Sequence, residues 1–443
     1  MRNILLLIVG LVSCVTIDAG ELTKSQNHGL TVHEWGTFTS VQGSDGNLIR
    51  WNPFETDALP SFVYDRLSPL SNAPSESKVK QIQNRLFAKA RKSWLQRMET
   101  PVIYAYNDKA LNLDVRIDFP KGEITEWYPQ VSGFGPTARL NEIVPATRDS
   151  FVEWQNVRIE SHSSDKGEVI PAKTSSNHYF EARGVSSNLL TAHNGLTKEF
   201  KPQTEQFLFY RGVGDFSAPL SIKFNSPQNF LIRNSGKEVI PFLLLIEVRG
   251  DQAGFSILPA LAAKEKQQTR LTLRDSWIPV ADMEAQVTKA LETALVDSGL
   301  FLKEAQSMVA TWRKSWLTEP GTRILYILPR KWTDTTLPLQ LDPKPDHLER
   351  VMVGRAEVIA PSIESELQSL YVAYNRGEIN SKVASQKFVQ LGLGRFSEPA
   401  LSRLQIMRYE KVASVIAGLK FNIQEASQKT VEGEKLAQVE FID

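Results

Sequence analysis

In the stretch LNLDVRIDF, residues 111–119, apolar and polar side chains alternate without interruption. One face of this segment would carry Leu111, Leu113, Val115, Ile117 and Phe119, and the other would carry Asn112, Asp114, Arg116 and Asp118. A period of two is typical of a β-strand that buries one face and exposes the other to water. The sequence therefore predicts sheet structure in this part of the chain.

Similar short segments follow along the chain, separated by turn signals such as Asn234-Ser235-Gly236. They are EITEWY (123–128), FVEWQNVRIE (151–160), HYFEAR (178–183), QFLFYR (206–211), LSIKF (220–224), NFLIR (229–233) and VIPFLLLIEV (239–248). Many short strands punctuated in this way favour an antiparallel sandwich.

Helical patterns interrupt these strands and then replace them. Apolar residues recur at helical spacing over residues 76–95 and 281–299, and Gly299 is well placed to end the second of these helices. We expect a further helix over residues 302–316 and strands at RILYIL (323–328) and VMVGRAEVI (351–359). Three helical stretches are expected over residues 361–419, the first of which ends before Gly377.

Together these patterns predict an α+β fold: a β-rich antiparallel sandwich-like body with inserted helices and a helical C-terminal part. The expected divisions are a signal segment at 1–20, a β-rich body at 21–275 with a helix near 76–95, a helical hairpin plus strands at 276–360, and a helical region at 361–443.

Two stretches of the chain resemble each other: RKSWLQRMETPVIYAY (91–106) and RKSWLTEPGTRILYIL (313–328) align without a gap. Both are expected to end a helix and enter a strand. One interpretation is a pair of related helix-to-strand units, and the other is coincidence among common residues. The similarity does not extend past the strands, which favours coincidence.

The N-terminus predicts export. Arg2 precedes an unbroken apolar run over residues 4–12, which is typical of a secretory signal and shorter than the ~20 apolar residues that span a bilayer. Cys14 closes LVSC, which resembles a bacterial lipobox, so Cys14 is a candidate for lipidation. Ordinary cleavage after Ala19 or Gly20 is the alternative. The expected location is the outer membrane or periplasm for a lipoprotein, and otherwise the periplasm or the extracellular space.

Composition is that of an ordinary globular protein, with 42% apolar and 23% charged residues and a formal net charge of +1. This charge gives no support to a nucleic-acid partner. Cys14 is the single cysteine, so the folded part can hold no disulfide, and a chain of 443 residues does not need one to bury an ample core. Any membrane attachment is expected only through an N-terminal lipid anchor.

The stretch LTVHEWGTFTSVQGSDG, residues 30–46, suggests a site because His33 and Glu34 are adjacent. In a regular strand, however, His33 and Trp35 face one way while Glu34 faces the other, and the helical His-Glu-x-x-His zinc spacing is absent. The segment is therefore expected to be a core strand that ends in a hairpin turn at residues 43–46. The alternative is that His33 serves as a metal ligand or a general base.

Further histidines at 162, 178 and 193 lie in one polar region, where Asp165 and Glu181 could complete a mixed ligand shell. Their spacing matches no metal motif, and we expect no metal and no cofactor. No Gly-x-Ser-x-Gly elbow and no phosphate-binding Gly-x-x-x-x-Gly-Lys loop is present in the sequence. RGVGDF, residues 211–216, predicts a turn with Arg211 and Asp215 paired across it.

Aromatic residues beside charged ones are the remaining binding candidates. In TEWYP, Glu126 and Tyr128 would share one face of a strand and Trp127 would occupy the other. Exposed aromatics beside carboxylates and Arg would suit a sugar or a peptide, although most large aromatics are expected in the core. The binding candidates are His33, Trp35, Glu126, Trp127, Tyr128, His178, Arg211 and Asp215. Trp51, Trp154 and Trp332 are expected in strands or loops.

Six stretches together resemble a group of secreted bacterial proteins that share a His-Glu-Trp-Gly-Thr-Phe sequence. They are VHEWGTFTSV, METPVIYAY, ITEWYP, HYFEAR, FLFYRGVG and RILYILPR, and they span most of the chain after the signal. The resemblance implies export and a bacterial origin. The group has no assigned activity, so it implies no catalytic residues.

Two hypotheses follow. The first is a non-catalytic envelope or surface protein that binds an extracellular polymer or an envelope protein. The second is a hydrolase of such polymers, metal-assisted through His33 and the later histidines, or carboxylate-based through Glu34 and Glu126. Three polar groups that converge in a cleft would favour the hydrolase, and a packed His33 would favour the binding protein.

Overall fold

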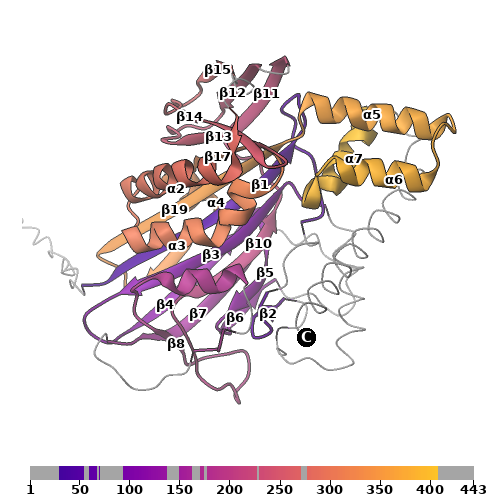
Figure 1. The fold of residues 1–443 in the computed structure, drawn as a ribbon. Coiled ribbons are helices and arrows are strands. Elements are labelled where there is room, and N and C mark those ends of the chain that lie inside the picture. The colour runs from indigo at the N-terminus through magenta and orange to yellow at the C-terminus, as the bar shows by residue number, and fades with distance from the viewer. Residues whose placement is uncertain are drawn as a thin grey trace, which may run out of the picture.

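The computed structural model describes residues 29–53, 59–66, 69, 93–136, 149–161, 170–173, 177–226, 229–270 and 277–407. Strands grouped in three sheets form the body, and helices follow at the C-terminal end (Figure 1). The α+β fold class predicted from the sequence is confirmed. None of the helices described combines the length and the apolar character that a membrane span requires.

The large sheet has the strand order β16-β14-β13-β17-β19-β1-β3-β10-β5-β2 within the described residues. Its neighbours are antiparallel except for β1 and β19, which run parallel in its centre. The strands are β1 (Thr31–Gln42), β2 (Tyr64–Asp65), β3 (Gln96–Tyr106), β5 (Gly122–Tyr128), β10 (Leu208–Gly214), β13 (Leu243–Arg249), β14 (Gln252–Leu258), β16 (Ile278–Pro279), β17 (Gly321–Ile327) and β19 (His347–Val358).

Two smaller sheets complete the body. One runs β18-β4-β7-β8-β9 with β6 paired to β7, and the other runs β11-β12-β15. The strands are β4 (Leu111–Phe119), β6 (Gly133–Gly135), β7 (Ser150–Ile159), β8 (Leu190–Ala192), β9 (Gln203–Glu205), β11 (Leu220–Ser226), β12 (Asn229–Asn234), β15 (Lys266–Arg270) and β18 (Leu339–Asp342). In β4 the apolar residues after Leu111 are buried while Asn112 and Asp114 are exposed, as the alternation predicts.

Helices α2 (Val280–Asp297) and α3 (Leu302–Arg313) lie along the large sheet together with the 3-10 helix η1 (His178–Gly184) (Figure 1). Gly299, at φ 108°, follows the end of α2 as predicted. A π-helical turn, η3 (Lys314–Thr318), continues α3 and leads into β17, and α4 (Arg330–Thr336) precedes β18.

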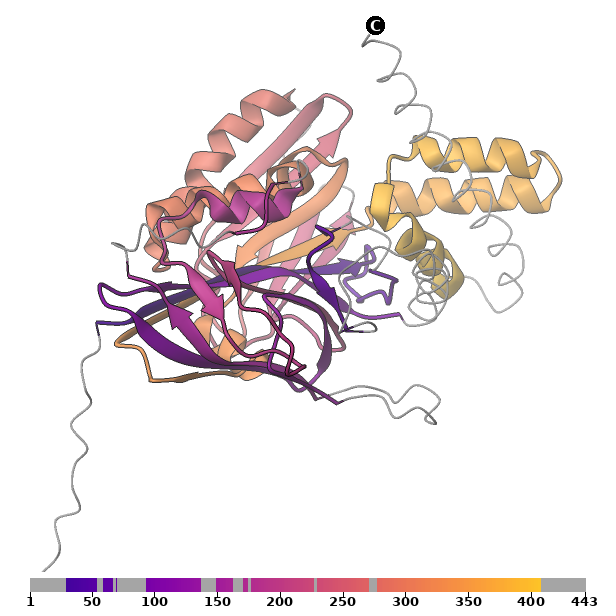
Figure 2. The same cartoon turned by 90° about the horizontal axis from the view of Figure 1, so that it is seen from below.

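The C-terminal helices form a group beside the sheets (Figure 2). They are α5 (Pro361–Asn375), α6 (Ser381–Gln390), the short 3-10 helix η4 (Gly394–Phe396) and α7 (Ser397–Met407). These helices pack with Val41, Ile49 and Trp51 in a second hydrophobic cluster, separate from the main core. Helix α5 ends before Gly377, as predicted, because Gly377 at φ 71° adopts the left-handed conformation that ends helices.

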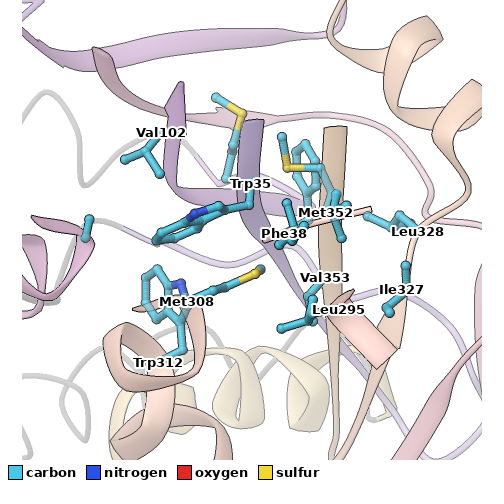
Figure 3. Packing of buried hydrophobic residues seen from close by; sticks show 14 of the residues in the cluster. Trp35, Phe38, Val102, Leu295, Met308, Trp312, Ile327, Leu328, Met352 and Val353 are labelled. Carbon is cyan, nitrogen blue, oxygen red and sulfur yellow. The ribbon is translucent and has the colours of Figure 1, made fainter. Parts of the chain in front are cut away.

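Strand β1 is buried on both faces, and its side chains alternate between two environments. Trp35 is fully buried and faces Met308 and Trp312 of α3 (Figure 3). Phe38 points to the opposite side of the sheet, where its ring packs against Phe216 and Trp332. The predicted core strand is therefore confirmed, and residues 43–46 form the predicted turn, in which Gly46 N donates to Gly43 O at 3.0 Å.

Two local predictions are wrong. HYFEAR is not a strand but the helix η1, because the Asn177 side chain accepts from Tyr179 N and the buried residues Tyr179, Phe180 and Ala182 do not alternate. RGVG is not a turn but the end of β10, where Gly212 allows close contact: a Cβ there would lie 2.3 Å from Glu123 O. Residues 76–92 of the predicted helix, with the start of the first RKSWL copy, lie outside the described residues. Residues 93–95 are described and are not helical, because Trp94 forms a β-bridge with Trp51.

Candidate functional site

His33 lies on the α3 side of β1 in a polar cluster that joins β1, β3 and α3. Its Nδ1 is 2.7 Å from Glu304 Oε2, and its ring packs against Tyr106 and Phe301. The Tyr106 hydroxyl donates to Glu304 Oε1 at 2.6 Å, and Phe301 N donates to Glu304 Oε2 at 2.7 Å. Burial, followed by the Glu304 charge, raises the pKa of Tyr106 well above its ordinary value.

This geometry fixes the His33 ring. Tyr106 and Phe301 N both donate to Glu304, so its carboxylate acts as the acceptor and the Nδ1 side of the His33 ring is directed at it as a donor. Such a pair can orient a general base, but His33 is only 3% exposed and Glu304 is fully buried. Within the described residues, no group of three or more His, Cys, Asp or Glu side chains is arranged to hold a metal ion.

Glu34 belongs to a separate network on the other face of β1. It accepts from Tyr210 and forms an ion pair with Arg350, and Arg350 Nη1 also donates to Asp334 Oδ1 at 2.8 Å. Burial, followed by the Glu34 charge, raises the pKa of Tyr210 well above its ordinary value. His33 and Glu34 therefore lie in opposite environments, as the alternation in β1 predicts.

Glu126 and Arg211 form an ion pair between β5 and β10. They are partners in the strand register, with Arg211 Nε 2.9 Å from Glu126 Oε2. Asp215 instead pairs with Arg50. The predicted Arg211–Asp215 pair is therefore wrong, because Arg211 lies within a strand and reaches across to the neighbouring one.

A buried Arg–Glu network connects the large sheet to the helices that follow it. Arg355 of β19 lies 2.8 Å from Glu357 and 2.9 Å from Glu319, and Arg395 of η4 lies 2.9 Å from Glu99 of β3. Sequence reasoning missed this network because its members are far apart in the chain.

Two further arginines extend this network: Arg97 lies 3.6 Å from Glu99, and Arg323 lies 3.2 Å from Glu357. Burial lowers the pKa of each guanidinium to about 10, which leaves both charged at neutral pH. The network therefore holds ionised groups in contact inside the protein, where loss of one partner is costly.

Most aromatic binding candidates lie in the core. Trp35 and Trp127 are fully buried and Tyr128 is 4% exposed, so none of their rings lies open for a ligand to stack on. Trp51 and Trp154 are buried as well. Trp332 is partly buried and lies in helix α4, so its expected place in a strand or loop is wrong.

Of the later histidines, His178 and His193 are described, and they have different surroundings. His178 packs against the Trp312 ring at 5.2 Å between centroids, whereas His193 is exposed. Glu181 lies 3.7 Å from Lys173. His162 and Asp165 lie outside the described residues.

A polar groove crosses the outer face of the second sheet, where β18, β4 and β7 lie side by side. Its cavity volume is about 280 Å³ and it is open to solvent. The groove is lined by Asp114, Val115, Arg116, Glu153, Trp154, Gln155, Gln340, Leu341 and Asp342. The alternation in residues 111–119 places Asp114 and Arg116 on the outer face, but no local pattern indicates that β7 and β18 add to it.

Arg116 contacts several of the charged and aromatic side chains in and beside this groove. It donates to both oxygens of Asp118, with Nη2 2.8 Å from Oδ1, and its Nη1 lies 3.2 Å from Glu153 Oε2. Its guanidinium also lies over the Phe151 ring, 3.9 Å from the centroid. The hydrogen bonds to Asp118, assisted by Glu153, raise the pKa of Arg116. The same hydrogen bonds and the Phe151 ring hold the guanidinium in one direction.

Two carboxylates stand beside it. Asp114 and Asp342 are register partners on the neighbouring strands β4 and β18. Asp114 Oδ1 accepts from Asn156 N at 2.6 Å, and neither carboxylate forms an ion pair within the described part of the chain. The amides of Gln340 and Gln155 donate to Asp118 at 3.0 Å and to Glu153 at 3.2 Å. The groove thus presents fixed acceptors and donors together.

No family model and no curated protein matches the chain. Among solved structures, it is similar to the yeast delta-COP-I mu-homology domain complexed with a Dsl1 WxWxV peptide, at 7% identity and a TM-score of 0.26. It is also similar to the yeast delta-COP-I mu-homology domain, at 9% identity and a TM-score of 0.25. Each comparison covers 75% of this chain and 99% of the other. Likenesses this distant carry no argument about function.

Proposed function

We propose that this chain is an exported bacterial envelope or surface protein without catalytic activity, which binds an extracellular polymer or an envelope partner. The signal-like N-terminus and the resemblance to secreted proteins with the His-Glu-Trp-Gly-Thr-Phe stretch support export. The binding role rests on the groove over β4, β7 and β18.

The observation that carries the proposal is the fixed arrangement of Arg116. Its guanidinium is held by Asp118, by Glu153 and by the Phe151 ring, so little side-chain entropy remains to be lost when a ligand binds. Ligand sites typically combine a concave surface with a few polar groups fixed in position.

The groove does bring polar groups together, but Arg116 is bonded to Asp118 and Glu153, and Asp114 accepts from Asn156 N, so these groups already have partners within the protein. The packing of His33 also supports the non-catalytic form of the proposal. Its ring lies against Phe301 and Tyr106, and its Nδ1 is bonded to the fully buried Glu304. This arrangement is that of a satisfied core histidine, which ties β1 to α3.

Co-sedimentation with insoluble envelope polymers tests this function. The chain without its signal segment, residues 21–443, is mixed with purified cell-wall sacculi and with surface polysaccharide from a bacterial host. Arg116→Ala removes the central donor of the groove. Arg158→Ala is the matched control, because Arg158 lies on the neighbouring strand β7, is 47% exposed and pairs with Glu160 at 3.0 Å outside the groove.

We expect the wild type and Arg158→Ala to sediment with at least one polymer, and Arg116→Ala to bind at least tenfold more weakly at unchanged melting temperature. A wild type that remains in the supernatant with every polymer would contradict the proposal. Equal binding by Arg116→Ala would place the ligand elsewhere and remove the groove as its basis.

A further inference from the structure

We infer that the groove over β4, β7 and β18 binds a neutral glycan through pairs of sugar hydroxyls. The inference rests on the proposed function, because it names the class of ligand for the same groove. It follows from the mixture of hydrogen-bonding groups on this surface rather than from its charge alone.

The groove offers groups of both kinds. The carboxylates of Asp114, Glu153 and Asp342 accept hydrogen bonds, the guanidinium of Arg116 donates them, and the amide of Gln340 does both. A sugar hydroxyl is both a donor and an acceptor, so adjacent hydroxyls on one ring can satisfy a carboxylate and a guanidinium or amide together. The carboxylates of the groove outnumber its one guanidinium and would attract a cation, but a cationic ligand would leave the donors of Arg116 and Gln340 unused.

The Asp114–Asp342 pair indicates where in the groove the ligand hydroxyls would bind. Like charges directly opposite each other on neighbouring strands destabilise a sheet, and these two residues are register partners. Hydroxyl donors placed between them would each form a charge-assisted hydrogen bond, which is about twice as strong as a neutral one. The ligand contacts are therefore expected to concentrate at the β18 edge of the groove.

Size is consistent with a short segment of a longer chain. The volume of about 280 Å³ lies just below the ~300–1,000 Å³ of enclosed small-molecule pockets. An open groove of this size can hold part of a polymer that continues over the sheet on either side. This matches an envelope polymer better than a free metabolite.

Calorimetric titration of residues 21–443 tests the inference. The probes are four neutral oligosaccharides (maltohexaose, cellohexaose, chitohexaose and mannohexaose) and a hexalysine peptide. Asp342→Asn and Asp114→Asn keep an acceptor oxygen but remove the charge, and Arg158→Ala is again the control. Melting curves verify that each variant is folded.

We expect at least one oligosaccharide to bind, with affinity about tenfold lower in Asp342→Asn and Asp114→Asn and unchanged in Arg158→Ala. Failure of all four to bind at millimolar concentration would overturn the inference, as would equal binding by both Asp variants. Binding of hexalysine alone, lost in Asp342→Asn, would also overturn it but would leave the proposed binding function standing. Loss of polymer co-sedimentation would instead overturn the function itself.

Discussion

Glu99 of β3 and Arg395 of η4 form a buried ion pair between the large sheet and the C-terminal helices, with Oε1 2.9 Å from Nη1. Glu99 is 3% exposed. Burial acts to raise the pKa of Glu99, but Arg395 and then Arg97 outweigh it and lower the pKa from 4.5 to about 2. This carboxylate therefore stays ionised inside the protein and joins two parts of the fold.

Acid should weaken the protein through Glu99. Because its folded pKa lies below the unfolded one, its contribution is fully present above about pH 4.5 and is lost as the pH falls toward 2. Between pH 7 and pH 2, the free energy of unfolding measured in urea should therefore fall by about 3 kcal/mol more for the wild type than for Glu99→Gln. The exposed Glu181→Gln serves as control, and parallel curves for wild type and Glu99→Gln would refute the assignment.

His33→Ala should destabilise the protein by about 1–3 kcal/mol, because it leaves the fully buried Glu304 without one of its donors. His347→Ala is the matched control, since His347 is exposed on the neighbouring strand β19 and should shift stability by less than about 0.5 kcal/mol. Thermal and urea unfolding measure the stability of both variants. Equal stability of the two variants would mean that the His33–Glu304 bond contributes nothing.

The sequence correctly predicts the strands and helices that have one solvent-exposed face and one buried face. Strand β4 alternates visibly because Asn112 and Asp114 are exposed, and the apolar stripe of α2 marks its buried side. HYFEAR is too short to reveal its period. The charged groups that connect distant elements are invisible in the sequence, because Glu99 and Arg395 are 296 residues apart and no local pattern relates them.

The candidate site was predictable only in part, for the same reason. The outer positions Asp114 and Arg116 follow from alternation, whereas Glu153 and Asp342 join them only through the pairing of β7 and β18 with β4. The aromatic candidates show the reverse case. Composition indicates that Trp127 could bind a ligand, but only tertiary packing decides that its ring is buried.

Trp127→Ala should destabilise the protein by about 3–5 kcal/mol, the range for a large aromatic removed from a core. Trp127 is fully buried, packs against Phe134 and donates from Nε1 to Gln130 Oε1 at 2.8 Å. Denaturant unfolding measures the loss in the free energy of unfolding. Unchanged stability together with weaker ligand binding would instead return Trp127 to the binding surface.

Purified mature protein should contain no stoichiometric zinc. In the described part of the chain, His33 donates to Glu304 and Glu34 accepts on the opposite face, so the two adjacent residues do not share a ligand shell. Elemental analysis by mass spectrometry measures the metal content directly. One tightly held zinc per chain that disappears in His33→Ala would contradict this expectation.

The last prediction concerns Cys14, which lies outside the described residues. A lipidated Cys14 would carry a diacylglyceryl group on its sulfur and normally an acyl chain on the new N-terminus. More than one chain is needed for stable attachment, since a single chain binds a membrane only marginally. Residues 15–29 are mostly polar and would serve as a short tether between the bilayer and β1. We therefore expect the native protein to fractionate with membranes in a bacterial host, and Cys14→Ser to be released or left unprocessed. Wild-type protein in the soluble periplasmic or extracellular fraction, with an N-terminus at Gly20 or Glu21, would instead establish ordinary signal cleavage.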